Sequence, residues 1–151
     1  MLELKKLKQL REETGISMAL CKKALEESQG DINKARDLLN TWGIEKVKDK
    51  IERETSQGSI FSYIHHNYKI AGFVELLCET DFVAANEEFQ KLGKEISMQI
   101  ASVKPETAEE LLKQEYIRDP SKKISDLINE AVLKFGENIK IGKILRWELG
   151  V

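Results

Sequence analysis

The first part of the chain has apolar residues spaced three and four positions apart, which is the spacing of one helical face. Gly15 and Gly30 separate three such stripes, and Ser17 is a suitable N-cap for the second of them. The stripes consist of Leu4, Leu7 and Leu10; Cys21, Ala24, Leu25 and Ser28; and Ile32, Ala35, Leu38, Leu39 and Trp42. The pattern predicts three short helices within residues 1–43. The small residues of the second stripe would allow a neighbouring helix to approach closely.

Residues 44–57 are strongly charged and have few apolar anchors, so we expect a partly helical linker there. Beyond it the apolar period changes from that of a helix to that of a strand. Residues 58–66 and 69–79 are rich in β-branched and aromatic side chains, and Asn67 lies between them. This arrangement predicts a β-hairpin with Asn67 in its turn.

Two amphipathic helices and a last strand are predicted in the remainder. Asn86 is a suitable N-cap for a helix that extends to Val103, and Gly136 would end a second helix that begins near Ile124. A polar stretch around Pro105 and Pro120 separates the two. Alternation in the final strand places five apolar residues on one face, interrupted only by Lys143: Ile139, Ile141, Leu145, Trp147 and Leu149.

These elements predict an α+β fold. An N-terminal three-helix bundle precedes a small three-stranded antiparallel sheet that packs with helices on one face. The expected domains are a three-helix module at 1–43, a charged linker at 44–57 and an α+β core at 58–151.

Composition indicates a globular, reduced, cytoplasmic protein. Charged residues make up 33% of the chain, yet the formal net charge is only −2, which gives no support for direct nucleic-acid binding. No apolar stretch is long enough to span a membrane, and the charged N-terminus does not resemble a signal peptide. Cys21 and Cys78 lie far apart without the spacing of a redox or metal motif.

The residues required for catalysis or cofactor binding do not form a recognisable pattern. Neither glycine-rich phosphate-binding motif occurs in the sequence. His65 and His66 are neighbours on a predicted strand, so their side chains would point to opposite faces rather than share a metal. Cys78 lies in an apolar strand, where its thiol would be inert. We therefore expect no enzyme activity, no cofactor and no metal, and an enzyme built on Cys78 and the histidines is a distant alternative.

The stretch ETDFVAAN, residues 79–86, places a phenylalanine at an exposed strand-to-helix corner, where small or polar residues are usual. Phe82 has two interpretations. It could be a core staple that packs against Phe89 or the sheet, which is the more frequent role of an aromatic residue. Alternatively, it could be an anchor that inserts into a partner protein.

Three stretches of the chain resemble translation elongation factor Ts. They are LKQLREETGISMALCKKALEESQGDINKARDLL near the N-terminus, YIHHNYKIAGFVELLCETDFVAANEEF in the middle and LLKQEYIRDPSKKISDLINEAVLKFGENIKIGKILRWELG at the end. The C-K-K-A-L and E-T-D-F-V-A runs, in this order and at this separation, make the resemblance specific. The likeness covers most of the chain.

The resemblance implies guanine nucleotide exchange on the GTPase elongation factor Tu during protein biosynthesis. In that family the T-D-F-V corner enters the GTPase domain and disturbs the Mg²⁺ and phosphate site. Asp81 and Phe82 would have that role here, and Thr80 and Val83 would shape the corner. The N-terminal module would make a separate contact, for which the candidates are Met18, Lys22 and Lys23.

The sequence departs from the family at several positions. Ala85 replaces the usual arginine after the corner, and Tyr68 replaces a usual glycine in the hairpin turn. The stretch between Val103 and Leu111 is much shorter than in long family members, which carry a second half of the core. The resemblance therefore implies a homodimer formed through the C-terminal core, and the alternative is a monomer that binds one GTPase molecule with reduced contacts.

A different class of function remains open for the N-terminal module. The GDINKARDLL helix also resembles the third helix of ubiquitin-associated (UBA) domains, so the module could bind a peptide or a ubiquitin-like protein. That alternative leaves the second domain unexplained.

Overall fold

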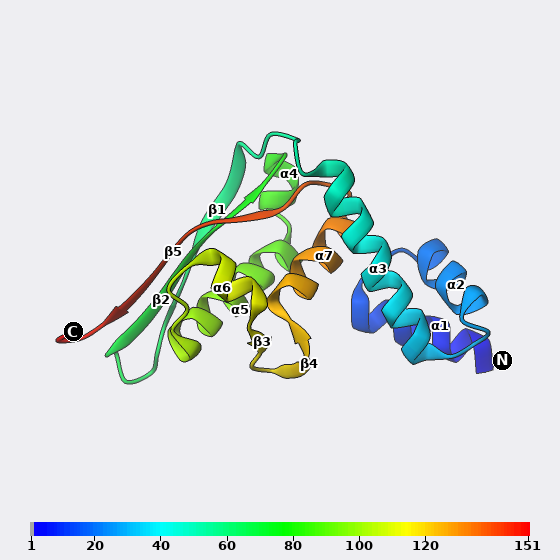
Figure 1. The fold of residues 1–151 in the computed structure, drawn as a ribbon, viewed down its shortest axis with the longest axis horizontal. Coiled ribbons are helices and arrows are strands. Elements are labelled where there is room, and N and C mark those ends of the chain that lie inside the picture. Colours follow the sequence, from blue (N-terminus) through cyan, green and yellow to red (C-terminus); the bar gives the residue numbers. More distant parts are fainter. Residues whose placement is uncertain (1) are drawn as a thin grey trace. The chain divides into compact units, whose positions relative to one another are not determined.

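The structure is a computed structural model that describes residues 2–151, and the chain divides into two compact units. The first unit contains Met1–Glu52 and Asn129–Gly136, and the second contains Arg53–Ile128 and Glu137–Val151. Figure 1 shows the order of the elements along the chain. Within the part that the structure describes, no helix is both long and apolar enough to cross a membrane.

The first unit is built on α1 (Leu2–Thr14), α2 (Met18–Glu27) and α3 (Ile32–Lys50). As predicted, Ser17 caps α2 and accepts a hydrogen bond from the Leu20 amide at 3.3 Å. The apolar stripes meet in a core whose buried members are Leu10, Ile16, Cys21, Ala24, Leu25, Ala35 and Leu39. Helix α3 continues to Lys50, so the first half of the predicted linker is helical.

The end of α7 (Ile124–Phe135) belongs to this unit rather than to the second one. Leu133 packs against the helical core, and Asn129 lies so close to α3 that a Cβ on Gly43 would be 2.7 Å from the Asn129 carbonyl oxygen. As predicted, the helix ends at Gly136, which has the positive φ of 70° that glycine tolerates.

The second unit contains the predicted antiparallel sheet, in the order β1 (Gln57–Ile64), β2 (Ile70–Cys78) and β5 (Lys140–Glu148). Helix α5 (Glu87–Val103) covers one face, where Phe61 and Phe89 pack edge to face with 5.9 Å between their ring centroids (Figure 1). The mixed fold with an N-terminal helical region and a small three-stranded sheet is therefore confirmed.

The prediction that the final strand has a single apolar face is wrong. Val74 pairs with Ile144, but Leu76 pairs with Ile141, so one residue of β2 lies opposite two residues of β5. This β-bulge shifts the alternation by one residue. Ile141 and Ile144 therefore face α5, and the side chains left on the open face, away from α5, include Leu145 and Trp147.

The region between α5 and α7 contains regular structure for which the sequence pattern gave no element. It holds α6 (Ala108–Lys113) and a two-stranded sheet of β3 (Glu115–Tyr116) and β4 (Asp119–Lys123). The buried Gln99 on α5 attaches this sheet, because its amide donates to the Glu115 carbonyl at 2.9 Å and accepts from the Ile117 amide at 3.0 Å. The β3–β4 sheet depends on hydrogen bonds to the side chain of Gln99, which is distant in sequence. The local apolar period therefore gives no sign of this sheet.

Candidate functional site

The corner after β2 is a single helical turn, α4 (Asp81–Ala84), followed at once by α5. Thr80 is its N-cap, and its hydroxyl accepts from the Val83 amide at 3.3 Å. Asn86 caps α5 as predicted, accepting from the Glu88 amide at 2.8 Å. Two consecutive caps define the path of the chain on both sides of the corner.

Phe82 is 88% exposed at this turn, so it is not a core staple. Phe89 instead fills the core position and is fully buried against Phe61. Asp81 is exposed next to Phe82, whereas Val83 is half-buried. The turn therefore presents an acidic and an aromatic side chain to solvent while Val83 faces the protein.

Hydrogen bonds from the chain before β5 hold the backbone at the base of the corner. The Glu137 carboxylate accepts from the backbone amides of Glu79 and Thr80, each at 3.1 Å, and from the Thr80 hydroxyl at 2.6 Å. No local pattern in the sequence marks Glu137 as a functional residue. Its G-E-N-I run is part of the resemblance, but a contact across 57 positions leaves no periodic signal.

Cys78 lies beneath the corner and is fully buried. Its thiol donates to the Thr80 carbonyl at 3.2 Å. Burial raises the pKa of the Cys78 thiol above its ordinary value, and the nearby charge of Glu137 adds to this effect. The reactive thiolate is therefore disfavoured at neutral pH.

The histidine pair is not part of a metal site in the described residues. The Tyr63 hydroxyl and His65 Nδ1 are 2.8 Å apart, and the rings of His65 and His66 pack with their centroids 4.1 Å apart. The prediction that the two side chains point to opposite faces of a strand is wrong, because β1 ends at Ile64, before the pair. No group of three or more His, Cys, Asp or Glu side chains within residues 2–151 is placed to hold a metal ion.

The three candidates on α2 are not all on one surface. Met18 is partly exposed, and Lys22 lies 4.0 Å from Glu26 on the side of α2 that faces α1. Lys23 points instead towards α3, with its ammonium 5.1 Å from the Trp42 ring centroid in a cation–π arrangement. A single partner surface on the α1 side would therefore contact Lys22 rather than Lys23.

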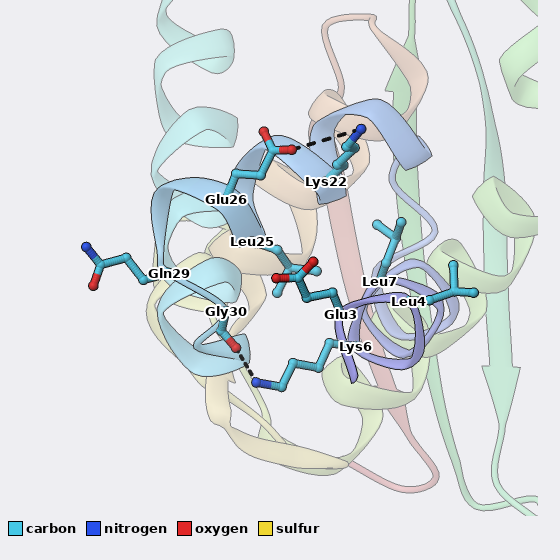
Figure 2. Close-up of a pocket in the computed structure, with 9 residues that line it drawn as sticks. All are labelled: Glu3, Leu4, Lys6, Leu7, Lys22, Leu25, Glu26, Gln29 and Gly30. Carbon is cyan, nitrogen blue, oxygen red and sulfur yellow. Dashed lines mark hydrogen bonds and ion pairs between the residues drawn. The ribbon is translucent and has the colours of Figure 1, made fainter. Parts of the chain in front are cut away.

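Lys22 borders an open groove of about 650 Å³ between α1 and α2. Figure 2 shows Leu4, Leu7 and Leu25 at this groove, with the Lys22–Glu26 pair at its border and the Lys6 ammonium bonded to the Gly30 carbonyl. The groove combines apolar and charged side chains of both signs.

An exposed aromatic anchor on a capped turn and an apolar groove with charged borders are features of proteins that act by binding other proteins. The sequence pattern of the family described as Elongation factor TS matches residues 79–150, which begin at the corner and include all of β5. The chain is 40% identical to elongation factor Ts of Thermodesulfovibrio yellowstonii, over 95% of this chain and 94% of that protein. It is 38% identical to elongation factor Ts of Thermosipho melanesiensis, over 99% and 100% of the two chains. The chain belongs to the elongation factor Ts family of translation elongation factors.

The relatives contain segments that this chain lacks. The alignment with the Thermodesulfovibrio protein runs over 188 positions, whereas this chain has only 151 residues. Elongation factor Ts of Aquifex aeolicus is 43% identical over 147 positions, but the match spans only 51% of that protein. The alignment of 188 positions therefore includes residues of the relative that have no counterpart in this chain.

Proposed function

We propose that this chain is a nucleotide exchange factor for elongation factor Tu, and that it promotes GDP release by inserting the Thr80–Val83 corner into the GTPase domain. The observation that carries the proposal is the 88% exposure of Phe82 on a turn capped by Thr80, in a member of the elongation factor Ts family. A large apolar side chain held in water becomes favourable once a partner buries it.

The mechanism requires binding but no chemical step. If the factor binds better to a GTPase whose nucleotide site is distorted, it weakens GDP binding, and GDP weakens factor binding by the same ratio. The Mg²⁺ ion that bridges the phosphates is a large local charge. Displacement of one of its ligands therefore strongly lowers the affinity of the GTPase for the nucleotide. In this mechanism Phe82 inserts into the GTPase domain and Asp81 makes a polar contact with it. Thr80 and Val83 maintain the conformation of the turn. This function needs no catalytic residue or cofactor, and the chain would not be an enzyme.

The direct test measures release of labelled GDP from elongation factor Tu, with excess unlabelled nucleotide and increasing amounts of this protein. The release rate should rise and then saturate with factor concentration. A protein that forms a complex with elongation factor Tu but leaves the release rate unchanged would contradict exchange while leaving binding intact. Capture of ubiquitin in place of elongation factor Tu would support the alternative role of the helical unit.

We propose a second contact with elongation factor Tu on the α1 side of α2, made by Met18 and Lys22. Lys22→Glu should weaken binding by about three- to tenfold through charge reversal at the border of an interface. The Lys22–Glu26 pair is highly exposed and contributes little to folding, so the melting temperature should not change appreciably. Calorimetric titration would measure the affinity.

Lys34→Glu on α3 is the matched control, because this exposed lysine lies outside the groove. Lys23→Glu provides a second comparison, since Lys23 faces Trp42 and should contribute less to binding than Lys22. Equal losses from all three reversals would indicate a general charge effect and contradict a localised contact.

We also propose that the core forms a homodimer through the open face of the sheet. The strand register places the half-buried Phe73 on that face. It also places four exposed side chains there, which are Ile60, Ile64, Leu145 and Trp147. An apolar sheet surface of this kind is typical of an interface. A second copy of the same chain could cover it with the same surface, as a two-fold interface requires.

Light scattering should give a dimer mass at protein concentrations on the order of tens of micromolar. Trp147→Asp should shift the mass towards the monomer without unfolding the chain, because this side chain is 65% exposed. Ile51→Asp, at an exposed apolar position of the first unit, should leave the dimer unchanged. A monomer mass for the unmodified protein across this concentration range would contradict the proposal.

A further inference from the structure

The proposed exchange corner stands on a short element that is weak without support. Helix α4 has four residues, and a single isolated turn is not stable in water because helix nucleation is unfavourable. Its conformation must therefore be maintained by residues outside the turn. The hydrogen bonds of Thr80 identify the residue that stabilises the turn.

Glu137 uses both oxygens of its carboxylate on the two residues that precede α4. One oxygen accepts from the Glu79 and Thr80 backbone amides, each at 3.1 Å, and the other accepts from the Thr80 hydroxyl at 2.6 Å. These contacts bridge 57 and 58 positions of sequence, all within the second unit. The carboxylate thus ties the base of the corner to the chain that enters β5.

The bond to the Thr80 hydroxyl also sets the direction of the helix cap. A hydroxyl has one proton to donate, and an ionised carboxylate can only accept. The Thr80 proton is therefore directed at Glu137, which leaves an oxygen lone pair for the Val83 amide at 3.3 Å. Glu137 acts on α4 through the orientation of its N-cap.

A reciprocal set of bonds fixes Glu137 against the same strand. The Asn138 backbone amide donates to the Glu79 carboxylate at 2.6 Å, and the buried Asn138 side-chain amide donates to the Arg53 carbonyl at 2.8 Å. Arg53 in turn lies 3.7 Å from the Glu79 carboxylate. The two chain segments therefore exchange bonds in both directions, so Glu137 cannot shift independently of the corner.

We propose that Glu137 is a positioning residue that preorganises the corner, so that Phe82 is presented in its binding geometry before the partner arrives. This inference rests on the proposed exchange function. Preorganisation improves binding because less conformational freedom is lost in the complex. Removal of the carboxylate should therefore raise the factor concentration needed for half-maximal GDP release, with a smaller effect on the maximal rate.

The first measurement uses the free protein and needs no partner. In Glu137→Ala, hydrogen exchange followed by NMR should become at least about tenfold faster at the amides of α4 and its cap, namely Val83, Ala84 and Ala85. Amides in the centre of β2, such as those of Val74 and Leu76, should keep their protection. Glu137→Gln should be intermediate, since its carbonyl can still accept from backbone amides but its NH₂ group cannot accept from the Thr80 hydroxyl.

The second measurement is GDP release from elongation factor Tu. Glu137→Ala should raise the half-maximal factor concentration by about 10- to 30-fold and leave the maximal rate within about twofold, and Glu137→Gln should recover part of the loss. Glu109→Ala, an exposed glutamate on α6, is the matched control and should change neither quantity.

The two measurements separate this inference from the proposed function. Normal amide protection of α4 in Glu137→Ala, or equal loss of protection throughout β2, would overturn the positioning role. If α4 loses protection but half-maximal release does not change, the role in exchange is overturned. If the unmodified protein does not accelerate GDP release from elongation factor Tu, the proposed exchange function is contradicted. The role of Glu137 in exchange is then contradicted as well, even if α4 loses its amide protection in Glu137→Ala.

Discussion

Phe82→Ala should reduce the efficiency of GDP release by about 30- to 100-fold with almost no change in folding stability. A phenylalanine that enters a pocket buries roughly 150–250 Å². At about 25 cal/mol per Å² this corresponds to several kcal/mol, of which about 2–3 kcal/mol remains after ordering costs. Each 1.4 kcal/mol or so is a tenfold change in efficiency. Because Phe82 is 88% exposed, the melting temperature should shift by no more than about 2 °C, or should rise slightly.

Tyr68→Ala is a suitable control, since Tyr68 is an 84% exposed aromatic residue in the hairpin turn of the same unit. It should leave GDP release unchanged. Asp81→Ala should have a smaller effect than Phe82→Ala, about two- to tenfold, because a polar contact contributes about 0.5–1.5 kcal/mol net. Early melting of Phe82→Ala combined with normal GDP release at low temperature would contradict the role of Phe82 as an inserted anchor.

Gly72→Ala should destabilise the second unit by about 3 kcal/mol or more. Gly72 lies on β2 directly beneath α5, where an added Cβ would be 2.1 Å from the Ser97 carbonyl oxygen and 2.8 Å from the Ala101 amide nitrogen. Both contacts are with helix backbone, so relief requires α5 to move away from the sheet. Overpacking of this kind costs about 1–3 kcal/mol when only side chains adjust, and more when they cannot. Urea unfolding followed by circular dichroism would measure the loss.

Gly142→Ala provides the matched comparison on β5. Its added Cβ would also meet an atom at 2.1 Å, but that atom is the carboxylate oxygen of the flexible Glu75 side chain. The side chain can rotate away, so the expected cost is below about 1 kcal/mol. Similar losses for the two variants would show that the contact between β2 and α5 is not the reason for glycine at position 72.

Local signals in the sequence predicted most of the elements correctly because they report the immediate environment of each residue. The apolar period identified α1 to α3, α5 and α7, and the capping residues Ser17 and Asn86 placed two helix starts where the structure has them. Phe82 was recognisable as unusual, but its two interpretations differed only in exposure. That property depends on how the corner packs against the sheet and α5, and in the structure Phe89 is buried while Phe82 is 88% exposed.

Features that depend on contacts between distant residues were decided by the tertiary structure alone. The bulge in β5 reverses which apolar residues face α5, because the register follows pairing with β2 rather than alternation within one strand. Gln99 attaches a small sheet that has little apolar patterning of its own. Glu137 supports the corner from 57 positions away. A residue's neighbours along the chain determine periodicity and capping, whereas pairing register, burial and long-range hydrogen bonds arise only when separate segments pack together.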